Sequence, residues 1–203
     1  MQRPLELFDF IPLMRRRRLF GLAAASVCMS GVALAHNAVG FVNPPQMPPR
    51  TRVQSHLGRA TPLAALFNGK VTALQLMFTG CSATCPIQGA LFASVQEKLL
   101  ALSAPIQSAQ LISFSIDPMG DGPRELRQWL KTFDAGKQWL GLTPNLKDLD
   151  PFLDFLQGRA KNSDRHTGQV YFFDHKGQLA LRSTDFPPAD LVVQRLKELA
   201  ARP

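Results

Sequence analysis

The stretch that decides the fold is residues 71–86, which read VTALQLMFTGCSATCP from Val71 to Pro86. Residues 71–78 form an apolar run of strand length, and the turn signal Asn68-Gly69 precedes them. Pro86 follows the second cysteine, a place where the first turn of a helix tolerates proline. The stretch therefore predicts a buried strand, a short loop that carries Cys81 and Cys85, and a helix.

The rest of the chain continues this alternation of strands and helices. Apolar residues recur at helical spacing after the loop, at Ile87, Leu91, Val95, Leu99 and Leu102. The later predicted elements are a strand over 111–116, a helix opening at 121–123, a short strand over 139–142, a helix over 146–156, a hairpin of 169–174 and 178–182, and a helix over 189–201. Such alternation favours a parallel core with crossovers. We therefore expect an α/β fold of the thioredoxin-like type, with a central mixed sheet flanked by helices and a C-terminal β-hairpin and helix.

Residues 1–35 have the pattern of an export signal. Arg15 to Arg18 precede an uncharged run of apolar and small residues, and Ala33-Leu-Ala35 is a cleavage pattern. Translation from Met14 would give a more ordinary signal. We expect cleavage after Ala35 rather than a retained membrane anchor, because the apolar run is short for a spanning helix. The arginine pair at 17–18 also resembles a twin-arginine signal, so the expected location is the periplasm, with inner-membrane attachment if the segment is kept.

Two further parts follow the signal. Residues 36–54 contain the proline-rich stretch 43–49 and predict an extended linker. Residues 55–203 remain as the thioredoxin-like domain. The formal net charge is +8, and beyond residue 35 the chain keeps 18 basic and 13 acidic residues, a net +5. These basic residues are scattered and not interleaved with aromatic ones, so no nucleic-acid partner is expected.

The cysteines indicate a reactive site. Cys28 lies in the export segment, which leaves Cys81 and Cys85 as a close pair. A disulfide closing so small a loop gains little entropy, so in an oxidising compartment the pair indicates a redox or metal site better than a structural staple or two spectator thiols. A helix N-terminus stabilises thiolate and lowers thiol pKa values. Thiolates select soft or borderline ions, chiefly Cu(I), Cu(II) and Zn(II).

Two thiolates leave room for a third ligand, and the chain has four histidines. His36 would begin the mature chain, His56 precedes the first core strand, and His175 lies in the predicted hairpin turn, where a solvated side chain is expected. His166 enters the hairpin on a loop that, in a thioredoxin-like fold, passes over the helix N-terminus carrying the thiols. Taken alone, His166 fits a surface loop residue as well as a ligand.

Three segments resemble the Sco/SenC family and occur in the family's order. They are LMFTGCSATCP with its C-x-x-x-C-P motif, LISFSIDPMGDGPRELRQWLKTF, and HTGQVYFFDHKGQL. The resemblance covers about residues 55–200 and implies a thioredoxin-like fold with one copper ion, Cu(I) or Cu(II), bound by Cys81, Cys85 and His166. It also implies copper delivery to the CuA site of cytochrome c oxidase, or reduction of the cysteines of that site.

The chain departs from the family pattern between the cysteines. Ser82-Ala83 stands where family members usually carry Pro-Asp, and Thr79-Gly80 replaces a frequent aromatic residue. Groups around a metal tune its affinity and potential, so these departures put both in question. Asp117 and Asp121 match the family's Asp-containing turn. Ending a strand and starting a helix are ordinary uses of Asp, and a contact with the surroundings of the site is the alternative.

Three functions remain open from the sequence. The first is a metallochaperone, whose partner would be the copper-site subunit of cytochrome c oxidase or another thiol or copper protein. The second is a thiol–disulfide oxidoreductase without copper, in which Cys81, the more N-terminal and more exposed thiol, attacks first. The third is a module that senses copper or redox state. Of these we favour the metallochaperone over an enzyme.

Overall fold

The computed structural model describes residues 38–104, 106–160 and 166–202. The predicted export segment lies outside the described residues. Among the residues that are described, no helix is long and apolar enough to cross a membrane.

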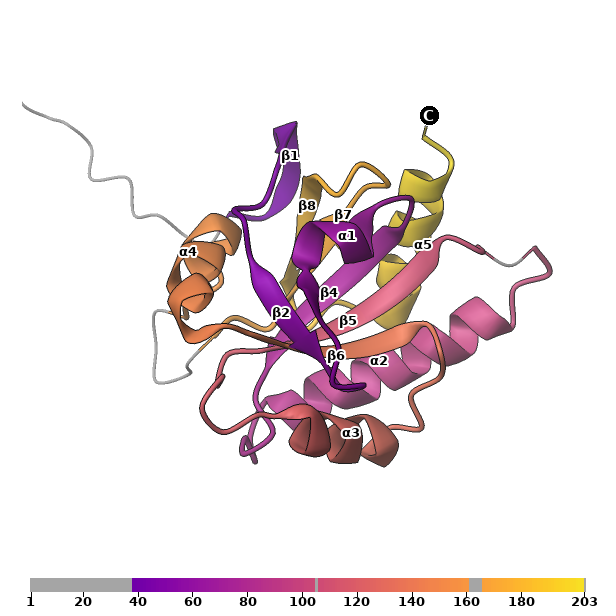
Figure 1. Ribbon diagram of the computed structural model, residues 1–203. Coiled ribbons are helices and arrows are strands. Elements are labelled where there is room, and N and C mark those ends of the chain that lie inside the picture. Colours follow the sequence, from indigo (N-terminus) through magenta and orange to yellow (C-terminus); the bar gives the residue numbers. More distant parts are fainter. Residues whose placement is uncertain (1–37, 105, 161–165, 203) are drawn as a thin grey trace, which may run out of the picture. The chain divides into compact units, whose positions relative to one another are not determined.

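The strands form one mixed sheet of eight, in the order β1-β8-β7-β4-β5-β6-β2-β3 (Figure 1). Strands β4, β5 and β6 pair in parallel, and the other pairs are antiparallel. The strands are β1 Gly40–Gln46, β2 Arg52–Ser55, β3 Ala60–Pro62, β4 Val71–Met77, β5 Ala109–Ser115, β6 Trp139–Pro144, β7 Gln169–Phe173 and β8 Leu179–Asp185. The predicted mixed sheet and C-terminal hairpin are confirmed.

Helices cover both faces of this sheet. They are α1 Leu63–Phe67, α2 Cys85–Leu100, α3 Pro123–Thr132, α4 Leu146–Leu156 and α5 Ala189–Ala200. Apolar side chains of α2, α3 and α5 pack in one core cluster, and those of α1 and α4 pack in a second cluster (Figure 1). We call these two sides of the sheet the α2 face and the α4 face.

Strand β4 shows why the sequence folds this way. All of its residues are buried, as expected for a central strand covered on both sides. Ala73 and Met77 belong to the cluster of the α2 face, and Leu74 and Leu76 belong to the cluster of the α4 face. The continuous apolar run over 71–78 is therefore explained by alternation between two buried faces.

The predicted linker needs correction, because parts of it belong to the sheet. Residues 40–46 form β1, which pairs with β8, and residues 52–55 form β2, which pairs with β6. Strand β1 was predicted as part of a linker because it contains two adjacent prolines. They fall on an edge strand, where the register shifts between Phe41 and Gln46, and such positions tolerate residues without an N–H donor. Strand β3 and the short helix α1 were also not expected.

The buried stripe of α2 is also shifted from the prediction. Val95 and Leu99 are buried as expected, but Ile87 is 58% exposed and Leu91 is only partly buried. The buried residues of the helix are Cys85, Gln88, Gly89, Phe92, Val95 and Leu99. The helix has apolar residues on more than one side, so its spacing alone did not fix which side faces the sheet.

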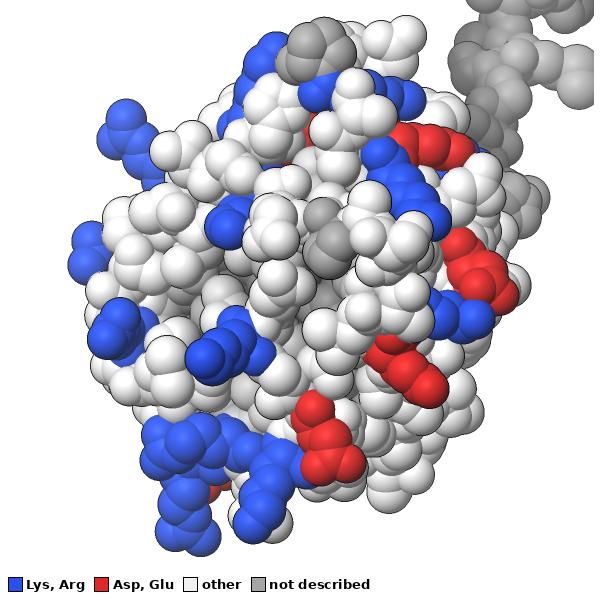
Figure 2. All heavy atoms as spheres, turned by 90° about the vertical axis from the view of Figure 1, so that its right-hand side faces the viewer, with Lys and Arg blue, Asp and Glu red and all other residues white. Residues whose placement is uncertain are grey.

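Charged side chains of both signs share the surface that Figure 2 draws. Lys and Arg residues are spread over this face, with Asp and Glu residues among them and uncharged surface between. Among the described residues, ion pairs join Lys98 to Asp190 at 2.8 Å and Arg195 to Glu198 at 2.6 Å.

Candidate thiol and metal site

The topology brings three loops to one edge of the sheet. Strands β4 and β5 are parallel, so the loops that follow Met77 and Ser115 leave the sheet at the same edge. Strand β7 is antiparallel to β4, with Val170 opposite Gln75, so the segment before β7 arrives at that edge as well. The cysteine loop, the turn with Asp121 and the residue His166 therefore meet although they are far apart in the sequence.

The cysteine loop places the two thiols in different surroundings. Cys85 is the first residue of α2 and is completely buried, whereas Cys81 in the loop is partly exposed. The sulfur of Cys81 accepts a hydrogen bond from the backbone N–H of Cys85 at 3.4 Å. The residue before the helix, Thr84, makes no side-chain cap, so the Cys81 sulfur satisfies one of the free N–H groups at this helix end.

The pKa values of the two thiols move apart. Burial is the largest single influence on Cys81 and raises its pKa, but hydrogen bonds from the Cys85 thiol, from backbone groups of Cys85 and Ala83 and from Thr84 together outweigh it and lower the pKa. Burial raises the pKa of Cys85 to about 12, helped by the hydrogen bond to Cys81 and by the charge of Asp121. The expected lowering by the helix N-terminus therefore holds for Cys81 and fails for Cys85, because desolvation there is stronger.

His166 faces the buried thiol. Its Nε2 atom lies 3.4 Å from the sulfur of Cys85, and its Nδ1 atom lies 2.9 Å from the carbonyl oxygen of Thr167. A carbonyl oxygen can only accept, so Nδ1 carries the proton and donates. In the neutral ring, Nε2 then presents its lone pair to the sulfur. The ring is 4% exposed and meets Phe78 edge to face, with ring centroids 6.3 Å apart.

Hydrogen bonds of the next residue, Thr167, help to fix the position of His166. The N–H of Thr167 donates to the carbonyl of Gly158 at 2.9 Å, and the Thr167 hydroxyl lies 2.7 Å from the hydroxyl of buried Tyr171. Gly158 sits so close to the sheet that an added Cβ would lie 2.6 Å from a methyl carbon of Leu76. A larger residue at 158 would require the Leu76 side chain to move, next to the carbonyl that holds Thr167.

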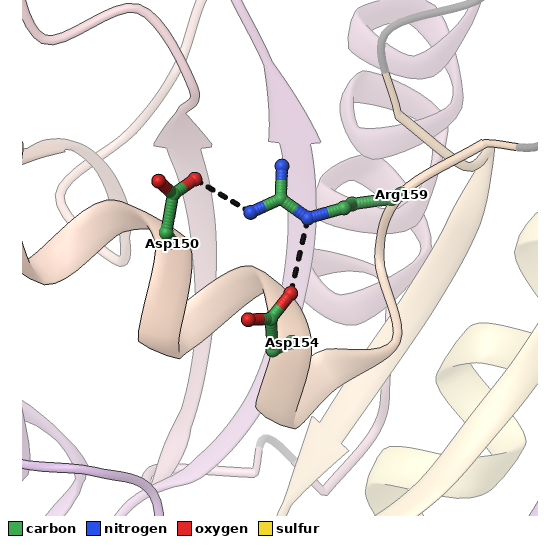
Figure 3. A network of polar contacts seen from close by, with 3 residues as sticks. All are labelled: Asp150, Asp154 and Arg159. Carbon is green, nitrogen blue, oxygen red and sulfur yellow. Dashed lines mark hydrogen bonds and ion pairs between the residues drawn. The ribbon is translucent and has the colours of Figure 1, made fainter.

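An ion-pair network ties the chain after α4 back onto that helix. The guanidinium of Arg159 donates to Asp150, and its Nε donates to Asp154 at 3.0 Å (Figure 3). Hydrogen bonds to these two carboxylates raise the pKa of Arg159. The side chains are mostly exposed, so the network orients the chain beside Gly158 more than it stabilises the fold.

Asp121, which the sequence predicted to start a helix, contributes to the surroundings of the thiols instead. It is 2% exposed and accepts hydrogen bonds from the backbone N–H of Thr79 at 3.0 Å and from the hydroxyls of Thr79 and Ser115. It does not cap α3, whose preceding residue is Gly122. Asp121 instead fixes the loop two residues before Cys81, so the contact with the surroundings of the site is the correct alternative.

The structure brings the predicted residues together but does not preassemble a ligand cage. Cys85 contacts His166, and Cys81 contacts the backbone N–H of Cys85. Among the described residues, no three His, Cys, Asp or Glu side chains already form a group that could hold a metal ion. His56 binds the backbone of Gly141, on the side of the sheet near β6, and His175 lies half-buried in the β7–β8 turn, so neither joins the thiols. His36 lies outside the described residues.

The fold has a loop with two cysteines at the start of a helix. A histidine lies beside this loop, just before the neighbouring antiparallel strand β7. This arrangement is that of a thioredoxin-like protein with a pair of thiols at its site. Comparison with known proteins narrows this class. The SCO1/SenC family profile matches residues 55–200, and the chain belongs to this family. The resemblance drawn from the three sequence segments is thereby confirmed.

Known relatives agree with the assignment. The chain is 31% identical over 80 residues to the SCO1 protein homolog of Bacillus subtilis (strain 168), a match that spans 39% of each protein. The solved structure of BsSco, a Sco-family cytochrome c oxidase assembly protein with a disulfide switch, has a TM-score of 0.67 at 21% identity and covers 79% of this chain and 96% of that one. The structure of Arabidopsis thaliana ScoI with copper bound has a TM-score of 0.65 at 18% identity, covering 77% and 99%. At these identities the structures establish the shared thioredoxin-like fold.

Proposed function

We propose that this protein is an exported metallochaperone that binds copper and delivers it to the copper-site subunit of a respiratory oxidase. The observation that carries the proposal is the contact between the Cys85 sulfur and the His166 Nε2 atom at 3.4 Å, made between two buried residues. The partly exposed thiol of Cys81 lies beside them, and its sulfur accepts a hydrogen bond from the backbone N–H of Cys85.

The donor set suits copper as cargo. Two thiolates and one imidazole are soft to borderline ligands, the combination that Cu(I) and Cu(II) accept. His166 meets a further requirement of a metal ligand, because its Nδ1–H is held by a carbonyl and its Nε2 atom faces the sulfur of Cys85. Cys81 has to turn inward to complete the set. A ligand at the mouth of the site that can turn in and out suits an ion that must be taken up and then released.

The relatives support the partner as well as the cargo. Copper is bound in the solved Arabidopsis relative, and BsSco is described as a cytochrome c oxidase assembly protein. For this chain we propose the same kind of client, an oxidase subunit with thiol ligands at its copper site. The export pattern of residues 1–35 places the encounter in the periplasm, either free or next to the inner membrane if the segment is retained.

A copper titration tests this proposal. The purified protein should take up one equivalent of copper and show a thiolate-to-Cu(II) charge-transfer band. Cys81→Ala, Cys85→Ala and His166→Ala should each lose most of the binding, whereas His175→Ala, which changes a histidine in a turn outside the site, should bind as the wild type does. Unchanged binding in the three site variants would contradict the proposal.

A second function, thiol–disulfide exchange without copper, is favoured by the difference between the two thiols. Cys81 is accessible and has a lowered pKa, which suits a nucleophile that attacks a client disulfide. Cys85 is buried with its pKa raised to about 12, which suits a resolving thiol that acts after the mixed disulfide has formed.

The role of His166 separates the two functions. An oxidoreductase should reduce a small disulfide substrate at nearly the wild-type rate after His166→Ala, and the wild type should bind no copper. A metallochaperone should lose copper binding in the same variant. Both properties should be measured on the same preparations of the wild type and His166→Ala. Copper binding that is present in the wild type and lost in the variant favours the metallochaperone. Disulfide reduction that persists in the variant, with no copper bound by the wild type, favours the oxidoreductase.

A further inference from the structure

Gln88 is a buried polar residue whose side-chain amide makes no hydrogen bond to the described residues. It lies on α2, one turn after Cys85, and is completely buried. Its backbone N–H makes the normal helical bond to Thr84, but neither its side-chain oxygen nor its side-chain nitrogen has a hydrogen-bond partner among the described residues. Leaving such a group unpaired in the interior destabilises the fold, so a buried glutamine here requires an explanation.

Gln88 and the buried thiol of Cys85 share one side of α2, and general helix geometry favours an amide that points toward the site. Cys85 and Gln88 are three residues apart and both belong to the buried stripe of α2. Side chains at this spacing are neighbours on one helix face, with Cβ atoms about 5–6 Å apart. Long side chains in helices also point back toward the N-terminus, over the preceding turn. The turn that precedes Gln88 is the one that carries Cys85.

The sulfur of Cys85 changes as an acceptor when it binds a metal ion. A thiol is a weak hydrogen-bond acceptor, so the thiol form described here offers little to an amide donor. A metal-bound thiolate carries negative charge, and charge-assisted hydrogen bonds are about twice as strong as neutral ones. Cys85 is completely buried, so water has little access to this sulfur, and a hydrogen bond to it has to come from a protein group.

We propose that the Gln88 carboxamide donates an Nε2–H hydrogen bond to the sulfur of Cys85 in the copper-loaded protein and is thus a positioning residue for the copper site. The inference rests on the proposed copper function and specifies which buried group prepares Cys85 as a ligand. Gln88 is kept unpaired in the copper-free form and gains its partner when the cargo arrives. The cost in the copper-free fold and the gain in the loaded fold come from the same amide.

The test is Gln88→Leu, which removes the amide and keeps most of the side-chain volume. The copper-free variant should unfold at a higher denaturant concentration than the wild type, because an unpaired buried amide has been removed. Its Cu(I) affinity, measured by competition with a chromophoric chelator, should fall about ten- to hundred-fold, the loss of one hydrogen bond to a charged group. The charge-transfer band of the Cu(II) form should move to lower energy, because the sulfur lone pairs are no longer stabilised by the donor.

Thr143→Val provides the matched control. Thr143 lies on β6, is 6% exposed, and its hydroxyl also lacks a partner among the described residues. Removing this hydroxyl should stabilise the copper-free and copper-loaded proteins equally and leave the affinity and the absorption band unchanged. Gln88→Asn, which keeps the amide on a shorter side chain, should bind copper with an affinity between those of the leucine variant and the wild type.

The outcomes separate the inference from the function on which it rests. Wild-type copper binding together with equal affinity and an unshifted band in Gln88→Leu would overturn the role of Gln88 and leave the metallochaperone standing. Equal stabilisation of the copper-free and loaded forms by Gln88→Leu would overturn it as well, because Gln88 would then behave as Thr143 does. A wild type that takes up no copper would overturn both.

Discussion

The two faces of the central sheet are built from the same strands but carry different side chains. On β4 and β5, apolar residues Leu74, Leu76, Ile112 and Phe114 face α4, and the buried polar pair on this face, Thr72 and Gln110, lies at the strand ends away from the site. On the opposite, α2 face the same strands place Gln75, Ser113 and Ser115, all buried. Gln75 donates to the Ser113 hydroxyl at 3.0 Å, and the indole of Trp139 donates to the same oxygen at 2.8 Å.

The difference shows where the fold gains stability and where it holds the site. The α4 face is stabilised by aromatic packing, for example of Phe114 on Phe152 with ring centroids 4.6 Å apart. The polar residues of the α2 face continue to the sheet edge, where Ser115 donates to Asp121 and Asp121 holds Thr79. We call the residues Gln75, Ser113, Ser115 and Asp121 the polar line. Substitutions on the α4 face are expected to lower stability without changing the reactivity of the thiols. Substitutions on the polar line are expected to change both stability and thiol reactivity.

The largest effect is expected from Phe152→Ala on the α4 face. Phe152 is completely buried, and truncating such a ring leaves a cavity that costs about 3–5 kcal/mol of the free energy of unfolding. Chemical denaturation should show this loss, while the alkylation rate of Cys81 in the folded protein should stay at its wild-type value. Phe155→Ala, on the same helix but only partly buried, should cost less. A changed Cys81 rate in Phe152→Ala would mean that the two faces are not independent.

A smaller loss is expected from Asp121→Asn on the polar line. The amide can accept one hydrogen bond but presents N–H groups where Thr79 and Ser115 also donate, so about 1–3 kcal/mol of stability should be lost. The loop before Cys81 should loosen, and the alkylation rate of Cys81 should change in this variant. Asp174→Asn is the control, because Asp174 accepts backbone N–H groups in a turn outside the site. An alkylation rate equal in both variants would argue against Asp121 as the anchor of the loop.

The sequence predicted the fold correctly where burial produces a regular pattern of apolar residues. The strand at 71–77, the hairpin of 169–173 with 179–185 and helix α3 were all found, because a strand covered on both faces or an amphipathic helix leaves a periodic signal. Strand β1 was missed because its prolines resemble a linker, and edge pairing has no periodic signal of its own. The buried side of α2 was misplaced because Gln88 occupies a position where the pattern calls for an apolar residue.

The site was predicted less completely than the fold. Spacing identified the cysteine pair, but the proximity of His166 came mainly from the family resemblance, since 81 residues separate it from Cys85. The anchoring role of Asp121 depends on which loops share a sheet edge, which no local pattern reveals. The opposite pKa shifts of the two thiols depend on burial, and both cysteines look alike in the sequence.

The smallest expected effect is a loss of stability at alkaline pH. It compares a buried titratable group on each face of the sheet, Cys85 on the α2 face and Tyr171 on the α4 face. Burial raises the pKa of Cys85 from 9.0 to about 12, so this thiol stays protonated in the folded protein while it ionises in the unfolded chain above pH 9. The stabilisation is present below pH 9 and is lost as the pH rises toward 12; linkage gives about 1 kcal/mol between pH 9 and pH 10. Tyr171, on the α4 face, has a pKa raised by burial from 10.0 and adds its loss of stability only above that pH.

Denaturation at pH 8.5, 9.5 and 10 should therefore show a decline of stability in the wild type and in Phe152→Ala, and a flatter profile in Cys85→Ala. A decline of equal slope in Cys85→Ala would assign the loss to groups outside the site.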